Sequence, residues 1–122
     1  MVVVDASALA AVLFDEPAGA AMVHRLVDHE LHVPALFYVE LTNIACSKAR
    51  MRPADRLAFE ASLRDGLDYP ISVDAVDLLE VMGLELQTKL SAYDASYLWL
   101  ARRLDVPLVT LDKRLAAHAT RH

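Results

Sequence analysis

The chain has 122 residues, 56% of them hydrophobic, and carries a formal net charge of −5. This length fits one domain spanning residues 1–122, and the apolar fraction excludes a disordered chain. The negative charge argues against a broad electrostatic grip on nucleic acid, although bound metal ions can reverse the field locally.

The start of the chain and its cysteine bear on the cellular compartment. Residues 1–5 contain no basic region and no signal-peptide core, and no apolar stretch is long enough to span a membrane. The single cysteine, Cys46, cannot form an internal disulfide, and we expect it to be a small core residue rather than a nucleophile. The sequence therefore predicts a cytoplasmic protein with no membrane segment.

Short apolar runs alternate with longer amphipathic runs in the first half of the chain, which predicts strands separated by helices. The expected strands cover residues 2–4 and 31–33. The expected helices cover residues 7–14 and 19–29, then the stretch from Pro34 to about Arg50, and finally residues 54–64 before a stop at Asp65-Gly66.

The second half continues the alternation. Strands are expected at residues 70–73 and 107–110, with helices beginning at Ser91 and Asp112. Between them, Asp74 is expected to cap a helix whose core-facing side carries Val76, Leu79, Met82 and Leu86. The pattern predicts an α/β fold in three layers, with a mostly parallel sheet of four strands, or five, flanked by helices.

Four acidic residues stand at positions of special interest in this scheme. Asp5 and Asp112 follow the first and last predicted strands directly, and the carboxyl ends of parallel strands meet at one edge of a sheet. Glu40 lies inside an otherwise apolar helical stretch, and Asp94 lies in the first turn of its helix. A cluster of carboxylates cannot be both shielded from water and charged without divalent cations, so the pattern predicts a divalent metal and favours phosphate chemistry.

Three of these acids also have a simpler interpretation as helix caps. The candidate caps are Asp5 or Ser7 for the first helix, Ser91 with Asp94 for the sixth, and Asp112 or Thr110 for the last. Glu40 is different, because it shares a helix face with Leu36 and Asn43; its simpler interpretation is a water-exposed helix edge.

Several motifs, taken in order and spacing, carry a resemblance that covers nearly the whole chain. They are Val3-Val4-Asp5-Ala6-Ser7-Ala8-Leu9, Phe14-Asp15-Glu16-Pro17, Pro34-Ala35-Leu36 leading to Glu40 and Asn43, Tyr93-Asp94-Ala95-Ser96-Tyr97 followed by Ala101, and Val106-Pro107-Leu108-Val109-Thr110-Leu111-Asp112. With them the chain resembles the PIN-domain ribonucleases, most closely the VapC-type toxins of bacterial toxin–antitoxin pairs.

The resemblance implies a PIN fold and a nuclease site. In that family an acidic quartet holds Mg²⁺ or Mn²⁺ and cleaves single-stranded or loop RNA, and the quartet here would be Asp5, Glu40, Asp94 and Asp112. Ser7 and Thr110 match positions that line the site through hydroxyl groups, and Asn43 matches a polar position near the glutamate. The family also implies a small antitoxin whose tail threads over the site, and a homodimer.

We expect the residues of the site to have different chemical roles. Asp5 and Asp94 are the expected main metal ligands, and Asp112 would bind a second metal or act through water. Glu40 would orient or deprotonate the attacking water. Lys113 and Arg114, just after Asp112, are the best candidates to hold flanking RNA phosphates.

Other polar and aromatic residues are given smaller roles. No histidine is required, and all five are expected to be solvated; they are His24, His29, His32, His118 and His122. Tyr97 and Trp99 are candidates for base stacking, with core packing favoured for Trp99.

Three other functions compete with the nuclease. A PIN-like interaction module without activity keeps the fold, but the intact quartet argues against it. A receiver-like phosphoacceptor domain needs adjacent acids after the first strand, where Asp5 stands alone. A phosphatase of the Asp-x-Asp type needs an acid at position 7, which is a serine.

Overall fold

Four parallel strands form the centre of the computed structural model, which describes residues 1–119. They are β1 (Val2–Val4), β2 (Leu31–Pro34), β3 (Ser72–Asp74) and β4 (Leu108–Val109), in the spatial order β3-β2-β1-β4. Val3 aligns with His32 on one side and with Leu108 on the other. The predicted parallel sheet is confirmed, with four strands in the part of the chain that the structure describes.

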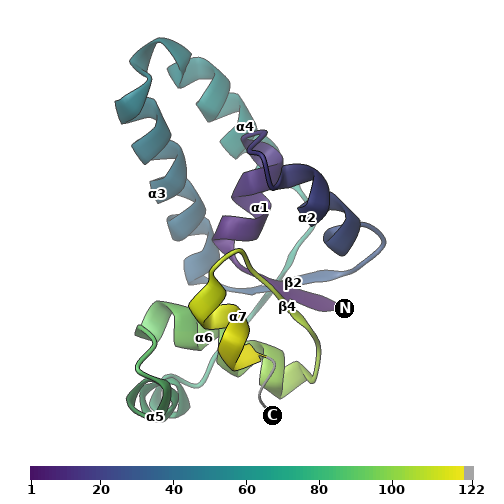
Figure 1. Cartoon of the computed structure of the whole chain (residues 1–122), viewed down its shortest axis with the longest axis vertical. Helices are drawn as coiled ribbons and strands as arrows, with labels where there is room; N and C mark the ends of the chain where they lie inside the picture. The colour runs from purple at the N-terminus through teal and green to yellow at the C-terminus, as the bar shows by residue number, and fades with distance from the viewer. Residues whose placement is uncertain (120–122) are drawn as a thin grey trace.

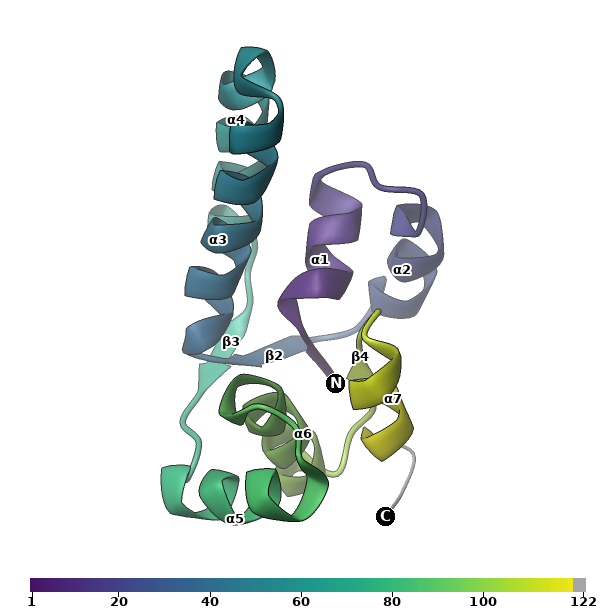
Figure 2. The ribbon, with the colours of Figure 1, turned by 60° about the vertical axis from the view of Figure 1, so that its left-hand side comes forward.

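Helices cover both faces of this sheet, as an open parallel sheet requires. They are α1 (Ala6–Leu13), α2 (Gly19–Leu26), α3 (Leu36–Met51), α4 (Arg56–Asp68), α5 (Leu78–Thr88), α6 (Ala92–Leu104) and α7 (Lys113–Ala119). Helices α1 and α2 lie on one face and α5 and α6 on the other, while α7 lies beside β4 (Figures 1 and 2). The hairpin of α3 and α4 extends beyond the sheet (Figure 1). The predicted three-layer α/β fold is confirmed.

The core explains why the short strands are stable. Every residue of β1 is buried, because helices cover the sheet from both sides. Phe37 and Leu41 of α3 are fully buried, and so is Leu115, which anchors the last helix to the rest of the fold. None of the helices in residues 1–119 is both long and apolar enough to cross a membrane.

Several predicted boundaries were wrong by a few residues. Helix α2 stops at Leu26 rather than at residue 29, and Asp28 then takes a left-handed backbone conformation with φ 64°. Pro34 ends β2 instead of opening the long helix, which begins at Leu36. β2 is an interior strand, but Pro34 is its last residue, so the backbone N–H that proline lacks falls at the end of the ladder.

Helix α4 runs straight through the predicted stop at Asp65-Gly66 and ends at Asp68, after a short 3-10 turn at Pro53–Asp55. Tertiary packing is the reason. A Cβ atom on Gly66 would lie 2.6 Å from Leu13 Cδ1 and 3.0 Å from Leu41 Cδ2. This glycine is therefore a site of close helix approach, not a helix terminator.

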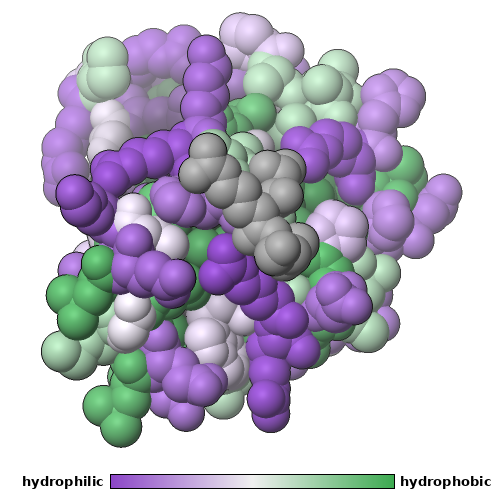
Figure 3. All heavy atoms as spheres, turned by 60° about the horizontal axis from the view of Figure 1, so that its bottom comes forward, coloured by the Kyte–Doolittle hydropathy of each residue, from purple (hydrophilic) through white to green (hydrophobic). Residues whose placement is uncertain are grey.

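The region around α5 departs most from the prediction. Asp74 ends β3 and does not cap a helix; the N-cap of α5 is Asp77, whose Oδ1 accepts hydrogen bonds from the backbone N–H groups of residues 79 and 80, each at 3.1 Å. Helix α5 buries Val81 and Leu84. The predicted core side of α5 is instead exposed, to 83% at Leu79, 60% at Met82 and 71% at Leu86. On the face formed by α5, α6 and α7, apolar side chains reach the surface among polar ones (Figure 3).

Two predictions about single side chains were also wrong. Cys46 is exposed rather than in the core. His32 is buried on β2, where Nδ1 lies 2.7 Å from Asp74 Oδ2 and Nε2 lies 3.1 Å from Glu30 Oε1. These carboxylates satisfy a polar ring that would otherwise be costly to bury. His122 lies outside the described residues.

Candidate active site

The order of the strands fixes where the acidic residues meet. From β1 the chain first adds β2 and β3 on one side, and only then returns to place β4 on the other side of β1. The switch point of the sheet therefore lies between β1 and β4, and ligands of open α/β sheets bind at the carboxyl ends of the strands there. Asp5 follows β1 at this point, and its backbone N–H donates to Val109 O of β4 at 3.1 Å.

A cavity of about 410 Å³ opens at this switch point and contains all four predicted acids. Its lining consists of Asp5, Ala6, Ser7, Val39, Glu40, Asn43, Ile44, Tyr93, Asp94, Tyr97 and Asp112. Two helices reach it because each has its first turns at the carboxyl edge: α3 leaves the end of β2, and α6 runs back to the start of β4. The sequence could not show that Asp94 reaches this edge, and the fold places it there.

Asp5 is the most enclosed acid of the cavity, with 5% of its surface exposed. Its Oδ1 accepts hydrogen bonds from Ser7 Oγ at 2.7 Å and from the backbone N–H of Ala8 at 3.1 Å, so it also caps α1. Its Oδ2 accepts from Thr110 Oγ1 at 2.5 Å. The carboxylate is held from both sides by the first turn of α1 and the end of β4, and its orientation is therefore fixed.

The segment after β4 is tied to Asp5 through the same hydroxyl groups. Thr110 Oγ1 accepts from the backbone N–H of Asp112 at 3.0 Å, and Ser7 Oγ accepts from the N–H of Leu111 at 3.2 Å. Asp112 Oδ1 in turn accepts from Leu115 N–H at 3.0 Å and so caps α7. Of the competing caps, Asp5 and Asp112 cap their helices, while Ser7 and Thr110 brace the cavity.

Glu40 is held by a partner that the sequence did not reveal. The hydroxyl of Tyr97 donates to Glu40 Oε1 at 2.5 Å, across 57 residues of sequence. Tyr97 is 1% exposed, so it cannot stack on a base as predicted. The spacing could have indicated that Tyr97 lies near the acids, because it stands three residues after Asp94 and therefore faces the same side of α6.

Burial and mutual repulsion raise the pKa of three of these carboxyl groups. Burial raises the pKa of Asp5, and the charge of Asp112 adds to this, while hydrogen bonds from Thr110, Ser7 and Ala8 oppose it. Burial also raises the pKa of Glu40, as do the charges of Asp94 and Asp5, against the hydrogen bond from Tyr97.

Asp94 shows the same balance at the start of α6. Burial is the main reason that its pKa is raised, followed by the charges of Asp112 and Asp5. A side-chain hydrogen bond with Ser91 and the positive charge of Arg114 lower this pKa. Ser91 is also the N-cap of α6, because its Oγ accepts a hydrogen bond from the backbone N–H of Asp94 at 3.2 Å. The four acids thus form one electrostatically coupled cluster that a cation would stabilise.

The donor set of the cavity fits a hard divalent cation. Carboxylate and hydroxyl oxygens are the ligands that Mg²⁺ and Mn²⁺ prefer, and among the residues that the structure describes no softer sulfur or imidazole ligand lines the cavity. Among residues 1–119, no three His, Cys, Asp or Glu side chains are arranged to hold one ion together. An ion bound here would therefore keep several water ligands, as Mg²⁺ usually does.

The remaining predicted residues fall into two groups. Asn43 and Ser7 line the cavity, whereas Lys113 and Arg114 stand outside it on α7, with Arg114 Nη2 donating to Lys89 O at 3.0 Å. Tyr93 stands in one of the sequence motifs but was assigned no role there; it lines the cavity with 63% of its surface exposed. Tyr93 is thus the aromatic ring of the cavity that solvent, or a base, can reach.

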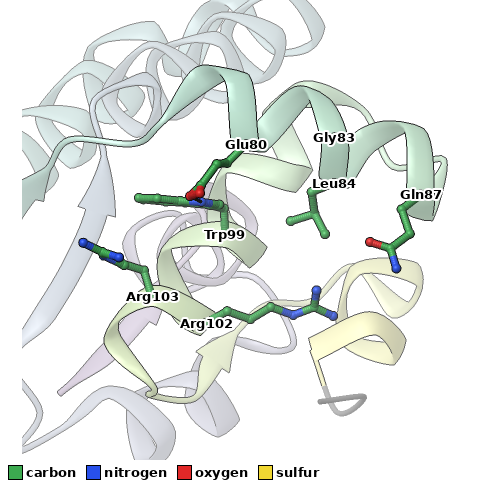
Figure 4. A pocket seen from close by; sticks show the side chains of 7 residues that line it. All are labelled: Glu80, Gly83, Leu84, Gln87, Trp99, Arg102 and Arg103. Carbon is green, nitrogen blue, oxygen red and sulfur yellow. Dashed lines mark hydrogen bonds between the residues drawn. The ribbon is translucent and has the colours of Figure 1, made fainter.

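A larger cavity of about 680 Å³ lies between α5 and α6, away from the quartet (Figure 4). Among the described residues Glu80 is the one acid that lines it, and Oε1 of Glu80 already accepts a hydrogen bond from Trp99 Nε1 at 3.0 Å. Trp99 is half-buried there, between the two helices, and Arg102 and Arg103 line the same hollow (Figure 4). This cavity brings no acids together, so the chemistry is placed in the smaller one.

Comparison with known proteins agrees with this fold. Residues 2–120 match the sequence profile of the PIN domain. The chain belongs to the PIN-domain family, as its motifs predicted.

Two ribonucleases and one solved structure are similar to this chain along most of its length. Ribonuclease VapC12 of Mycobacterium tuberculosis is 32% identical over 117 residues, covering 95% of this chain and 90% of that protein. The VapC ribonuclease Mb0985 of Mycobacterium bovis is 39% identical over 121 residues, covering 95% and 89%. The crystal structure of PAE2754 from Pyrobaculum aerophilum superposes with a TM-score of 0.81 at 29% identity, over 98% of this chain and 84% of that one.

Proposed function

We propose that residues 1–122 form a single PIN domain that acts as a metal-dependent endoribonuclease, the toxin of a toxin–antitoxin pair in the cytoplasm. The observation that carries this proposal is the cluster of Asp5, Glu40, Asp94 and Asp112 around one cavity at the switch point of the sheet. The two VapC ribonucleases, similar along almost their whole length, support the same function.

The proposed direct ligands of Mg²⁺ or Mn²⁺ are Asp5 and Asp94, and Asp112 would bind through a water molecule or hold a second ion. Asp5 Oδ1 already accepts two hydrogen bonds, whereas Oδ2 accepts one, from Thr110, and so keeps a further lone pair for an ion. When bound, such an ion lowers the pKa of a coordinated water and neutralises charge that develops on the phosphate. Ser7 and Thr110 act by holding Asp5 in place.

Glu40 is the proposed proton acceptor. Tyr97 occupies its Oε1, which leaves Oε2 to accept a proton from the water that attacks phosphorus. A carboxylate whose pKa is raised by burial is a better base than an exposed one. Asn43 would orient the substrate beside it, and Lys113 and Arg114 would contact phosphates farther along the strand.

Two protein partners complete the proposal. A small antitoxin would cover the cavity, and a second copy of the chain would form a homodimer. Leu79, Met82 and Leu86 follow one side of α5 and are all exposed, which supports a protein partner, because exposed apolar surface of this kind commonly marks an interface.

Cleavage of total bacterial RNA by the purified protein tests the enzymatic part. We expect discrete cuts with Mg²⁺ or Mn²⁺, none with EDTA, and a loss of at least 100-fold in Asp94→Asn. Asp105→Asn is the matched control, since Asp105 ends the same helix in a left-handed conformation that asparagine also adopts. Equal cutting by Asp94→Asn and the control would refute the assignment.

A further inference from the structure

A second groove continues from the acidic cavity and is not explained by metal chemistry. Its volume is about 470 Å³, and it shares Ser7, Asn43 and Ile44 with the acidic cavity. One wall is α1 and the other is α3. A substrate strand whose phosphate lies at the acids can therefore extend into this groove without crossing a barrier.

One stripe of α3 forms a continuous path along this groove. The stripe consists of Glu40, Asn43, Ile44, Ser47, Lys48 and Met51. These positions have the i, i+3, i+4, i+7, i+8, i+11 spacing of one helix face. From Glu40 to Lys48 the rise is about 12 Å, which is enough for the nucleotide next to the scissile phosphate.

The chemistry of the groove favours a base over a phosphate. Its cation, Lys48, already has Nζ 3.7 Å from Glu16 Oε2 and 5.5 Å from the centroid of the Phe14 ring, so it adds little free positive charge. Ala10 and Met51 give apolar walls, and Met51 is 84% exposed at the outer end. A flat, neutral heterocycle fits these surroundings better than an anion.

Polar groups that could distinguish one base from another stand at the inner end. Within residues 1–119 the Asn43 amide makes no side-chain hydrogen bond, so its donor and acceptor both remain available. Ser47 Oγ donates to Asn43 O at 3.1 Å and keeps its lone pairs to accept. Amides and hydroxyls in a partly apolar slot are the usual means of reading an unstacked RNA base.

We infer that the groove between α1 and α3 binds one nucleobase of the RNA, next to the scissile phosphate, and sets the sequence preference of the cut. This inference rests on the proposed function, because it assumes that RNA occupies the adjacent acidic cavity. Asn43 and Ser47 read the edge of the base, and Ile44 and Met51 contact its face.

The variant Ser47→Leu tests the groove with a matched control on the same helix. Ser47 and Thr42 are both exposed, and each donates its hydroxyl to the carbonyl four residues earlier, but only Ser47 lines the groove. Cut sites are mapped on a randomised single-stranded RNA library. We expect Ser47→Leu to reduce base discrimination about tenfold at one position beside the cut. Thr42→Leu should leave the preference unchanged.

Binding of phosphorothioate tetranucleotides of each base, measured by fluorescence anisotropy with Mn²⁺, separates the two proposals. Cutting with the same base preference in both variants overturns the groove and leaves the nuclease intact. No cutting, with base-dependent binding that Ser47→Leu removes, supports the groove and overturns the nuclease. Neither cutting nor base-dependent binding overturns both.

Discussion

Tyr97→Phe removes the hydroxyl that holds Glu40, together with the hydrogen bond between this hydroxyl and the backbone of Ala6. The substitution removes only a hydroxyl, so it leaves no cavity in the packing of a residue that is 1% exposed. It also deprives Glu40 Oε1 of its donor at 2.5 Å. A hydrogen bond to a charged group contributes about 1.5–3 kcal/mol. Because Glu40 is half-buried, solvent weakens the bond, and we expect a loss of about 1–2 kcal/mol in the free energy of unfolding, at or just below the lower end of that range.

The pH dependence of this loss has a definite sign. The pKa of Glu40 is raised above 4.5 in the folded protein, so its contribution to stability is fully present below 4.5 and is lost as pH rises through the folded pKa. The Tyr97 hydrogen bond limits that loss, because it lowers the pKa. Tyr97→Phe should therefore cost most at pH 7 and least below about pH 4.

Urea denaturation of a double-mutant cycle measures this coupling. The cycle contains the wild type, Tyr97→Phe, Glu40→Gln and the double variant, each at pH 7 and pH 4. We expect a coupling energy of about 1 kcal/mol at pH 7 and a smaller one at pH 4. Additive effects at pH 7, or a coupling that grows toward low pH, would refute this account of the Glu40 site.

Three further predictions follow from the structure. Mn²⁺ should raise the melting temperature at pH 7, because it relieves the repulsion among the acids. Differential scanning fluorimetry should show a smaller rise in the melting temperature of Asp94→Asn, and an equal rise would contradict the proposed site. Gly66→Ala should destabilise the protein by up to about 2 kcal/mol. Its Cβ would meet Leu13 Cδ1 at 2.6 Å and the fully buried Leu41 Cδ2 at 3.0 Å, and we expect this crowding to exceed the helix-propensity gain of about 1 kcal/mol. Gly83→Ala, with open space around it, should stabilise α5 by about 1 kcal/mol in the same urea assay. Asp77→Ala should cost about 1 kcal/mol of unfolding free energy by removing the cap of α5, and no change would place the start of α5 elsewhere.

Local patterns in the sequence were enough to predict much of the fold and where its acids meet. The run Val2–Val4 and the alternation that follows it predict a parallel sheet, because a strand buried on both sides is apolar throughout. Asp5 and Asp112 follow the two strands that flank the switch point, so topology alone brings them together. Their catalytic roles stay a prediction.

What the sequence did not reveal depends on contacts between distant residues. Helix α5 is apolar on two sides, so periodicity could not decide that Val81 faces the core and Leu79 the solvent. His32 is buried because Asp74, 42 residues away, lies 2.7 Å from its ring. Gly66 resembled a helix stop in the sequence. A glycine is needed there because α1 and α3 approach α4 closely, and this contact cannot be seen from the residues around Gly66.

The chemistry of the cut ends tests the central claim most directly, that the acidic cavity activates water to attack RNA. The substrate is a short RNA carrying one 2′-deoxyribose on the 5′ side of the mapped cut site, digested by the wild type with Mn²⁺. We predict that this RNA is still cut at the same bond, and that the unmodified RNA yields a phosphomonoester without a 2′,3′-cyclic phosphate. Cyclic phosphate ends, together with complete protection by the deoxyribose, would show that the ribose hydroxyl is the nucleophile and would contradict the account.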